Sequence, residues 1–294
     1  MPRFAYVNGQ YIPHRDASVH IEDRGFQFAD SVYEVIACMN GHLSDEQGHL
    51  DRLERSLKEL RMEMPMPRRA MKLVIREFIR RNKLKNASVY MQVTRGTAPR
   101  DFKFPAAPDY TFVMTVYPAT YNLEGRKAVA RKAFTTPDIR WKRRDIKSTA
   151  LLAQVLSKQA AIDKGGYEAW MVDDDGFITE GASSNAWIVD KKGNLVTRAT
   201  ANNSILKGVT RNAMQALLKK EGVKIVERAF TPKEAYEAQE AFTSSAVALI
   251  MPIVEIDGKK IGDGKPGPLT LKILEFYMNY AKDQAADQHV WTPA

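Results

Sequence analysis

The stretch Arg144-Asp145-Ile146-Lys147-Ser148 ends a basic loop that joins a predicted strand to a predicted helix. The strand is expected over 128–134 and the helix over 149–164, with Ser148 as its N-cap. A lysine at such a junction is usually a solvated surface residue. Lys147 therefore has a functional meaning only if the rest of the chain supplies partners for it.

Strands and helices alternate on both sides of this stretch. The pairs Asn8-Gly9 and Asp257-Gly258 each predict a hairpin, and leucines at helical spacing predict a helix over 45–62. Thr231 followed by a proline predicts the cap of a short helix. Further strands are expected at 88–95, 110–117, 168–172, 186–189, 195–198, 224–227 and 241–243, and further helices at 67–81, 209–221 and 269–283.

This alternation predicts an α/β or α+β protein with two domains. The 294 residues are enough for two domains of ordinary size. Residues 118–126 contain turn residues and little periodicity, so we expect an interdomain linker there. The expected domains are a smaller N-terminal α/β domain at 1–117 and a larger C-terminal domain at 127–294.

Composition and charge argue against several classes of protein. Apolar residues make up 44% of the chain and charged residues 27%, which is typical of a globular protein. The net charge of +9 is spread along the chain without a nucleic-acid-binding motif, so no nucleic-acid partner is expected. No apolar run approaches the roughly 20 residues of a membrane span, and no metal-ligand spacing is present. The single cysteine, Cys38, and the lack of an apolar signal segment favour the cytoplasm.

Three further segments carry small or polar residues where a ligand could bind. Residues 179–185 place one carboxylate, Glu180, in a predicted turn of small residues. Residues 206–211 open a helix after a glycine, and the N–H groups at a helix start bind phosphate well. Residues 243–245 place hydroxyls at the end of a predicted strand. Each segment taken alone is ordinary turn or cap chemistry.

Taken together and in this order, the segments resemble those of the fold-type IV pyridoxal-phosphate enzymes. This family includes D-amino-acid aminotransferases, branched-chain aminotransferases, (R)-amine transaminases and aminodeoxychorismate lyases. The resemblance covers nearly the whole chain and rests on the ordered set of motifs. Its landmarks are Glu22-Asp23-Arg24-Gly25, Phe28-Ala29-Asp30-Ser31-Val32-Tyr33-Glu34, His49-Leu50-Asp51-Arg52-Leu53, Asp145-Ile146-Lys147-Ser148, Thr179-Glu180-Gly181 and Leu206-Lys207-Gly208-Val209-Thr210-Arg211.

The resemblance implies a pyridoxal 5′-phosphate cofactor and a role for each matching residue. Lys147 would form the Schiff base with the cofactor, and its amine would then move the substrate proton. Glu180 would face the ring nitrogen, which must stay protonated if the ring is to accept electrons. Arg52 would bind the phosphate. The other implied cofactor contacts are Leu206 against the ring, and Val209, Thr210, Ser244 and Ser245 around the phosphate.

The implied substrate contacts centre on the loop 95–105. D-amino-acid aminotransferases carry a similar loop, in which an arginine and a histidine two residues later join a tyrosine to bind the substrate carboxylate. Arg100 and Tyr33 match the arginine and the tyrosine, but Phe102 stands where the histidine is expected and cannot donate a hydrogen bond. Ser183 is a further expected substrate contact. We therefore expect weakened binding of D-amino acids, or a preference that includes (R)-primary amines.

The expected function is transfer of the amino group of a D-amino acid to a 2-oxo acid by ping-pong chemistry. The enzymatic alternatives are an (R)-selective amine:pyruvate transaminase and a branched-chain L-amino-acid aminotransferase. A non-catalytic binding protein of the same fold is disfavoured by the presence of both Lys147 and Glu180. The resemblance also implies a homodimer and an α/β pseudo-barrel in the C-terminal domain.

Overall fold

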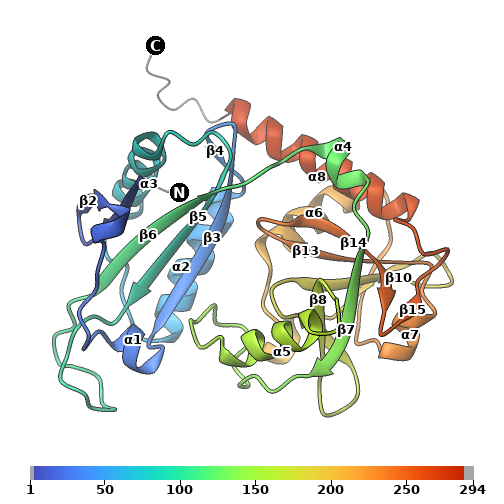
Figure 1. Cartoon of the computed structure of the whole chain (residues 1–294), viewed down its shortest axis with the longest axis horizontal. Coiled ribbons are helices and arrows are strands. Elements are labelled where there is room, and N and C mark those ends of the chain that lie inside the picture. Colours follow the sequence, from blue (N-terminus) through green and yellow to red (C-terminus); the bar gives the residue numbers. More distant parts are fainter. Residues whose placement is uncertain (1–2, 288–294) are drawn as a thin grey trace. The chain divides into compact units, whose positions relative to one another are not determined.

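The computed structural model describes residues 3–287, which divide into two compact units (Figure 1). The first unit holds residues 3–121, 146–150 and 281–287, and the second holds residues 122–145 and 151–280. The short segment with Lys147 therefore belongs to the first unit, while the chain on either side of it belongs to the second. The domain boundaries expected at 117 and 127 stay a prediction.

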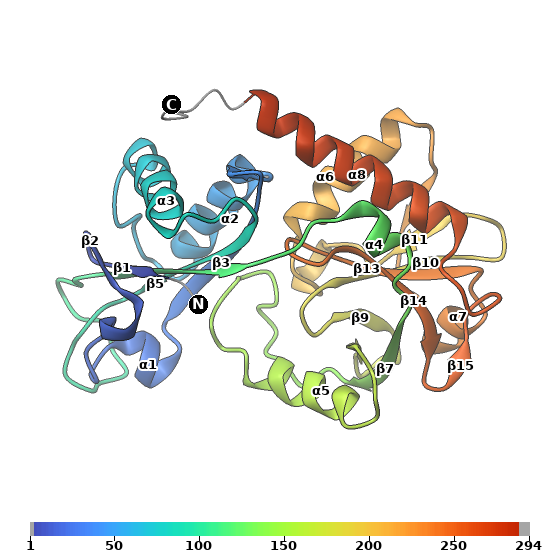
Figure 2. The same cartoon turned by 45° about the horizontal axis from the view of Figure 1, so that its top comes forward.

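The first unit is built on an antiparallel sheet of six strands in the order β2-β1-β6-β5-β3-β4. Two long amphipathic helices cover one face of this sheet (Figure 2). The strands are β1 (Phe4–Val7), β2 (Gln10–Pro13), β3 (Ser31–Met39), β4 (His42–Leu43), β5 (Ala87–Thr94) and β6 (Thr111–Pro118), and the helices are α1 (Arg24–Phe28), α2 (Glu46–Glu59) and α3 (Arg68–Asn82), with a 3-10 turn at His14–Asp16.

The core of the first unit forms where α2 and α3 meet the sheet. Leu50, Leu53 and Leu57 recur at helical spacing, so they lie on one stripe of α2 and are fully buried. Ile75 and Phe78 of α3 are buried in the same cluster. Burying a leucine side chain contributes roughly 1.5–3 kcal/mol, so this stripe fixes α2 against β3 and with it the polar residues on the helix.

The second unit contains a sheet in the order β12-β11-β10-β13-β14-β7-β8-β9, with β15 paired to β14. The end of this path curls back, because β9 lies against β10. This curled sheet is consistent with the expected pseudo-barrel. The strands are β7 (Arg131–Pro137), β8 (Glu168–Val172), β9 (Ile178–Gly181), β10 (Asn185–Val189), β11 (Leu195–Thr197), β12 (Ile225–Glu227), β13 (Glu240–Ser245), β14 (Leu249–Ile256) and β15 (Lys259–Lys260).

Helices complete the second unit, and the last turns of the longest one are assigned to the first. The start of α7 has a full capping box, in which Thr231 and Glu234 each bond the other's backbone N–H. In the described part of the chain no helix is long and apolar enough to cross a membrane. The helices are α4 (Leu123–Lys127), α5 (Leu152–Ile162), α6 (Val209–Lys220), α7 (Pro232–Tyr236) and α8 (Pro268–Asp287), with a 3-10 turn at Ala201–Asn203.

Most elements expected from the sequence are confirmed, and a few differ in position or type. Helix α5 begins at Leu152, and Ser148 is not its N-cap, because its backbone pairs with Val32 instead. Residues 179–181 are part of strand β9, although a turn is expected there. The strand expected at 128–134 lies about three residues later, and a short helix, α4, lies within the predicted linker. The sequence pattern does not predict strand β3. Its apolar residues form a nearly continuous run without the alternation that is typical of a half-buried strand.

Candidate functional site

Lys147 lies in an extended segment that is held against strand β3. The carbonyl of Lys147 accepts the N–H of Tyr33 at 3.0 Å, and Val32 and Ser148 form an antiparallel bridge. The N–H of Lys147 donates to Ser56 Oγ of α2 at 3.3 Å. These contacts fix the backbone of a partly buried lysine on both sides, so its side chain has a defined direction although it stands in a loop.

The side chain of Lys147 points toward an aromatic pair. Its Nζ lies 4.2 Å from the ring centroid of Tyr33, which stacks on Tyr90 with 5.6 Å between ring centroids. Burial and the neighbouring Tyr33 raise the pKa of Tyr90, so this hydroxyl stays protonated at neutral pH. The Lys147 amine therefore lies against one face of this aromatic pair.

Arg52, the expected phosphate residue, is held by a buried carboxylate that a histidine supports. Its Nε and Nη2 each donate to one oxygen of Glu34 at 2.7 Å, which makes the pair bidentate. His49 Nδ1 lies 2.7 Å from Glu34 Oε2, and Glu34 is fully buried. Burial alone would raise the pKa of Glu34, but Arg52 and His49 together lower it to about 2. Burial lowers the pKa of His49, which favours its neutral form.

Arg100 and Phe102 lie together on the loop that follows β5. The guanidinium carbon of Arg100 is 5.2 Å from the ring centroid of Phe28 and 5.9 Å from that of Phe102. Arg24 Nη1 donates to the carbonyl of Asp101 at 2.6 Å and ties the loop to α1. The Phe102 side chain is 81% exposed, so it is available to a ligand or to another chain.

The loop starts at a glycine that no other residue could replace without movement. Gly96 has φ of +86°, and a Cβ there would collide with the carbonyl of Asp109. The carbonyl of Gly96 accepts the N–H of Arg24 at 2.9 Å. The backbone of the loop is thus anchored at its base by close contacts, while its tip, with Arg100, is exposed.

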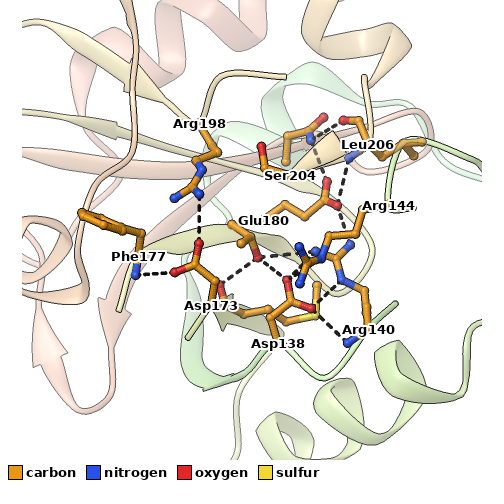
Figure 3. A network of polar contacts seen from close by, with 12 residues as sticks. Asp138, Arg140, Arg144, Asp173, Phe177, Glu180, Arg198, Ser204 and Leu206 are labelled. Carbon is orange, nitrogen blue, oxygen red and sulfur yellow. Dashed lines mark hydrogen bonds and ion pairs between the residues drawn. The ribbon is translucent and has the colours of Figure 1, made fainter. Parts of the chain in front are cut away.

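Glu180 of β9 is buried at the centre of a polar network in the second unit (Figure 3). Its Oε1 accepts from Arg140 Nη1 at 2.5 Å and from the N–H of Leu206 at 3.0 Å. Its Oε2 accepts from Asn185 Nδ2 at 2.9 Å. A carboxylate offers about four acceptor positions, so three donors among the described residues leave one position on Oε2.

The other end of Arg140 is bound to a second carboxylate. Arg140 Nε and Nη2 donate to the two oxygens of Asp138 at 2.9 and 2.8 Å. Asp138 Oδ2 also accepts from Thr179 Oγ1 at 2.7 Å and lies 3.2 Å from Arg144 Nε. Burial raises the pKa of Glu180, and Arg140 opposes that rise.

The start of α6 lies next to this network. Gly208 is the N-cap and offers no side-chain hydrogen bond to the first N–H groups of the helix. Leu206, two residues earlier, accepts Asn185 Nδ2 through its carbonyl at 3.1 Å. Val209 and Thr210 are buried, and the Thr210 hydroxyl has no hydrogen-bond partner among residues 3–287. A buried, unpaired hydroxyl at an uncapped helix start is suited to an anion.

The three expected serine contacts have protein partners of their own. Ser183 Oγ donates to the buried carboxylate of Glu168 at 2.8 Å. Ser244 Oγ accepts from Trp187 Nε1 at 2.9 Å, and Ser245 Oγ accepts the N–H of Ala248 at 3.3 Å. Each hydroxyl can still make a second hydrogen bond, because a hydroxyl is both donor and acceptor.

The structure therefore groups the expected residues into two sets, one in each unit. Tyr33, Arg52 and Lys147 lie close together through β3 and α2 in the first unit. Glu180 and Leu206 are bonded to each other in the second. Within the described ranges no group of histidine, cysteine and carboxylate side chains has the geometry of a metal site.

Sequence analysis assigns no role to five residues that the structure connects to these sets. Glu34 and His49 stand inside the quoted motifs, so their place in the motif is a usable signal. Asp138 and Arg140 are separated by one residue directly after β7, and Asn185 is the last residue of the small-residue segment and the first of β10. Such patterns are too common to identify a residue without the fold.

Comparison with known proteins shows to which family the chain belongs. Residues 31–256 match the family model described as amino-transferase class IV. The match covers well over half of the chain. The chain belongs to the class IV aminotransferases. The expected family, the expected fold class and the expectation of an enzyme are thereby confirmed.

Curated relatives resemble the chain over almost its full length. The D-alanine aminotransferase of Staphylococcus haemolyticus is 35% identical over 286 residues, which is 96% of this chain and 99% of the relative. The D-alanine aminotransferase of Bacillus licheniformis is 35% identical over 284 residues, covering 95% of this chain and 97% of the relative. The sequence similarity to these enzymes therefore extends over almost the whole chain.

Solved structures of branched-chain aminotransferases have the same fold. The enzyme of Escherichia coli superposes with a TM-score of 0.89 at 26% identity and covers 99% of this chain and 98% of its own. The branched-chain aminotransferase of Thermoproteus uzoniensis, solved with norvaline, has a TM-score of 0.85 at 24% identity and covers 97% of this chain and 97% of its own. The second likeness concerns the fold alone.

Proposed function

We propose that this protein is a transaminase that moves the amino group of a D-amino acid to a 2-oxo acid. The observation that carries the proposal is the 35% identity to D-alanine aminotransferases over nearly the whole chain. Identity to the branched-chain enzyme of Escherichia coli is lower, at 26%. Arg100, which matches the carboxylate-binding arginine of the D-amino-acid enzymes, also favours this interpretation over the branched-chain alternative.

As a class IV aminotransferase, the chain uses pyridoxal 5′-phosphate. The residues of the second unit fit this group by three observations. Glu180 has one acceptor position left for a ring N–H, and Thr210 has a buried hydroxyl without a partner among the described residues. The first N–H groups of α6 have no side-chain cap, which suits a phosphate. When bound, the cofactor supplies an electron sink for the bond at the substrate α-carbon.

Each residue of the proposed site would then have a separate role. The amine of Lys147 would hold the cofactor and would carry the proton to and from the substrate α-carbon. To accept that proton as a base, the amine must be neutral. Glu180 keeps the ring nitrogen protonated. Arg52, oriented by Glu34, and the Thr210 hydroxyl bind the phosphate.

Further contacts complete the proposed site. Leu206 would support one face of the ring, and the Val209 N–H, Ser244 and Ser245 would assist Thr210 at the phosphate. Tyr33, Arg100 and Ser183 would contact the substrate, with Arg100 binding its carboxylate. Since Phe102 cannot donate a hydrogen bond, we propose that binding of D-amino acids is weaker than with a histidine there, which leaves (R)-primary amines as the alternative donors.

A half-reaction screen tests the proposed function. The holoenzyme is mixed with D-alanine, L-leucine or (R)-1-phenylethylamine, and the loss of the visible absorbance band of the bound cofactor is followed. D-Alanine should bleach the band fastest, and 2-oxoglutarate or pyruvate should restore it. Bleaching by L-leucine alone would identify a branched-chain enzyme, and a sample without any band would contradict the transaminase assignment.

We also propose a homodimer in the cytoplasm. Leu152, Val155 and Leu156 on α5 are each more than half exposed at helical spacing and form an apolar stripe. A second copy of the chain is the proposed cover for this stripe. The cytoplasmic proposal is supported by Cys38, which is buried, unpaired and has a pKa raised by burial to about 11, so it is an inert thiol.

A further inference from the structure

We propose that Arg140 is a positioning residue that keeps Glu180 ionised and aimed, and so decides how strongly the protein binds the ring nitrogen of its cofactor. The proposal rests on the proposed function, since it concerns the same cofactor. It adds to that function a residue outside the family motifs quoted above. Arg140 would touch neither substrate nor cofactor and would act through Glu180.

The geometry gives Arg140 control over one oxygen of Glu180. Arg140 Nη1 and the N–H of Leu206 both donate to Oε1, so this oxygen has two donors, and the remaining acceptor position belongs to Oε2. Asn185 fixes the rotation of the carboxylate by donating to Oε2. Figure 3 shows Arg140 between Asp138 and Glu180, with all three side chains in one network. The carboxylate can thus present only one free lone pair.

Because Glu180 is buried, it needs a neighbouring positive charge to stay ionised. The side chains of Arg140 and Glu180 are only 6% and 5% exposed, and a buried carboxylate without a cation becomes protonated. A protonated Glu180 would be neutral and would no longer favour a charged ring nitrogen. Burial raises the pKa of Glu180, and Arg140 is the largest influence in the opposite direction.

Asp138 and Arg144 complete the charge balance around Glu180. The side chain of Asp138 is fully buried and binds Arg140 through both oxygens, and Arg144 forms an ion pair with the same carboxylate. Two carboxylates and two guanidinium groups thus form a neutral cluster. Uncharged groups also contact the cluster, namely Asn185, Thr179 and the backbone N–H groups of Leu206 and Arg140. A protonated ring nitrogen would donate to the acceptor position that remains on Glu180 Oε2.

Two cofactors that differ at one atom test this proposal. Dissociation constants are measured for pyridoxal 5′-phosphate and for its 1-deaza analogue, in which a C–H replaces the ring nitrogen. Wild type should prefer the natural cofactor. In Arg140→Gln we expect this preference to fall by about tenfold, the factor that corresponds to one pKa unit, with little change for the analogue. Arg140→Lys keeps a positive charge but loses the planar fork, so we expect a smaller fall.

The matched control is Arg198→Gln, which removes another largely buried guanidinium of the second unit. Arg198 binds Asp173 at 2.9 Å and does not contact Glu180, so both dissociation constants should change by the same factor or not at all. Equal losses of affinity for the two cofactors in both Arg140 variants would overturn the proposal. A residue with only a structural role would weaken the binding of both cofactors by the same factor. Failure of wild type to bind either cofactor would instead refute the proposed function on which it rests.

Discussion

The buried carboxylates of Glu34 and Glu180 hold the residues around them in fixed positions. Taking an ion out of water costs several kcal/mol unless its partners have good geometry. Glu34 meets this condition with a bidentate arginine and a histidine, and Glu180 meets it with Arg140 and two uncharged donors. In each unit, one acidic side chain and one arginine thus hold each other rigid before any ligand binds.

Replacement of Glu34 by glutamine should reveal this cost. The variant removes the bidentate carboxylate that binds Arg52, so we expect the free energy of unfolding at pH 7 to fall by about 3 kcal/mol in urea titrations. Because folding lowers the pKa of Glu34 from 4.5 to about 2, wild type should lose this contribution as the pH falls through that range. Glu34→Gln should lack this pH dependence.

Glu77→Gln is the control for that experiment. Glu77 binds Arg80 and Arg81 on the solvent side of α3, where a surface pair contributes less than about 1 kcal/mol. Equal losses in the two variants would show that the burial of Glu34 has no special importance.

Phe102 is the residue at which substrate preference should change. Phe102→His restores a hydrogen-bond donor beside Arg100, which should lower the KM for D-alanine by about tenfold, a change of about 1.4 kcal/mol in binding. Steady-state kinetics measure the change. Phe104→His, in the same loop but over Arg95, is the matched control and should leave the KM unchanged. No gain in Phe102→His would contradict the proposed substrate contact.

Helices and hairpins can be predicted from the sequence where the residues that determine them are adjacent in the chain. The caps of α7 and the hairpin at Asp257-Gly258 follow from residues that are adjacent in sequence, and both are present. The sequence pattern predicts that α5 begins after Ser148, but Ser148 pairs with β3, more than a hundred residues earlier. Pairing between distant residues leaves no local mark, and it is this pairing that holds Lys147.

The cap of α7 offers a test at this scale. Thr231→Ala removes the side-chain oxygen that accepts the N–H of Glu234, and we expect a loss of about 1 kcal/mol in the free energy of unfolding. Thr231→Ser keeps the oxygen and should lose only a fraction of that amount. Equal losses from both variants in urea titrations would mean that the threonine methyl group matters more than the cap.

At the scale of the whole molecule, the order of the motifs predicts more of the candidate site than any local pattern does. Lys147, Glu180 and Arg52 are expected because ordered motifs span the chain, and they remain proposed functional residues. Asp138 and Arg140 cannot be predicted, because their partners lie about 40 residues away in sequence and meet them only after the second sheet has formed. The hydroxyl of Ser183 is expected to face a substrate, yet it also binds a buried carboxylate that the sequence does not reveal.

The proposed dimer is tested by charging the apolar stripe of α5. Leu152→Glu combined with Leu156→Glu should convert the dimer to a monomer, because each buried glutamate would lack a partner. Light scattering after size-exclusion chromatography gives the molecular mass. Leu73→Glu changes a comparably exposed leucine on α3 and should leave the mass unchanged. A monomeric wild type would contradict the dimer.

Chemical trapping of the cofactor tests the central claim most directly. Borohydride reduces the bond between an enzyme amine and the cofactor aldehyde to a stable one, and peptide mass spectrometry then locates the modified lysine. We predict modification of the peptide that contains Lys147, with loss of the visible absorbance band. An unmodified protein, or modification at a different lysine, would contradict the account.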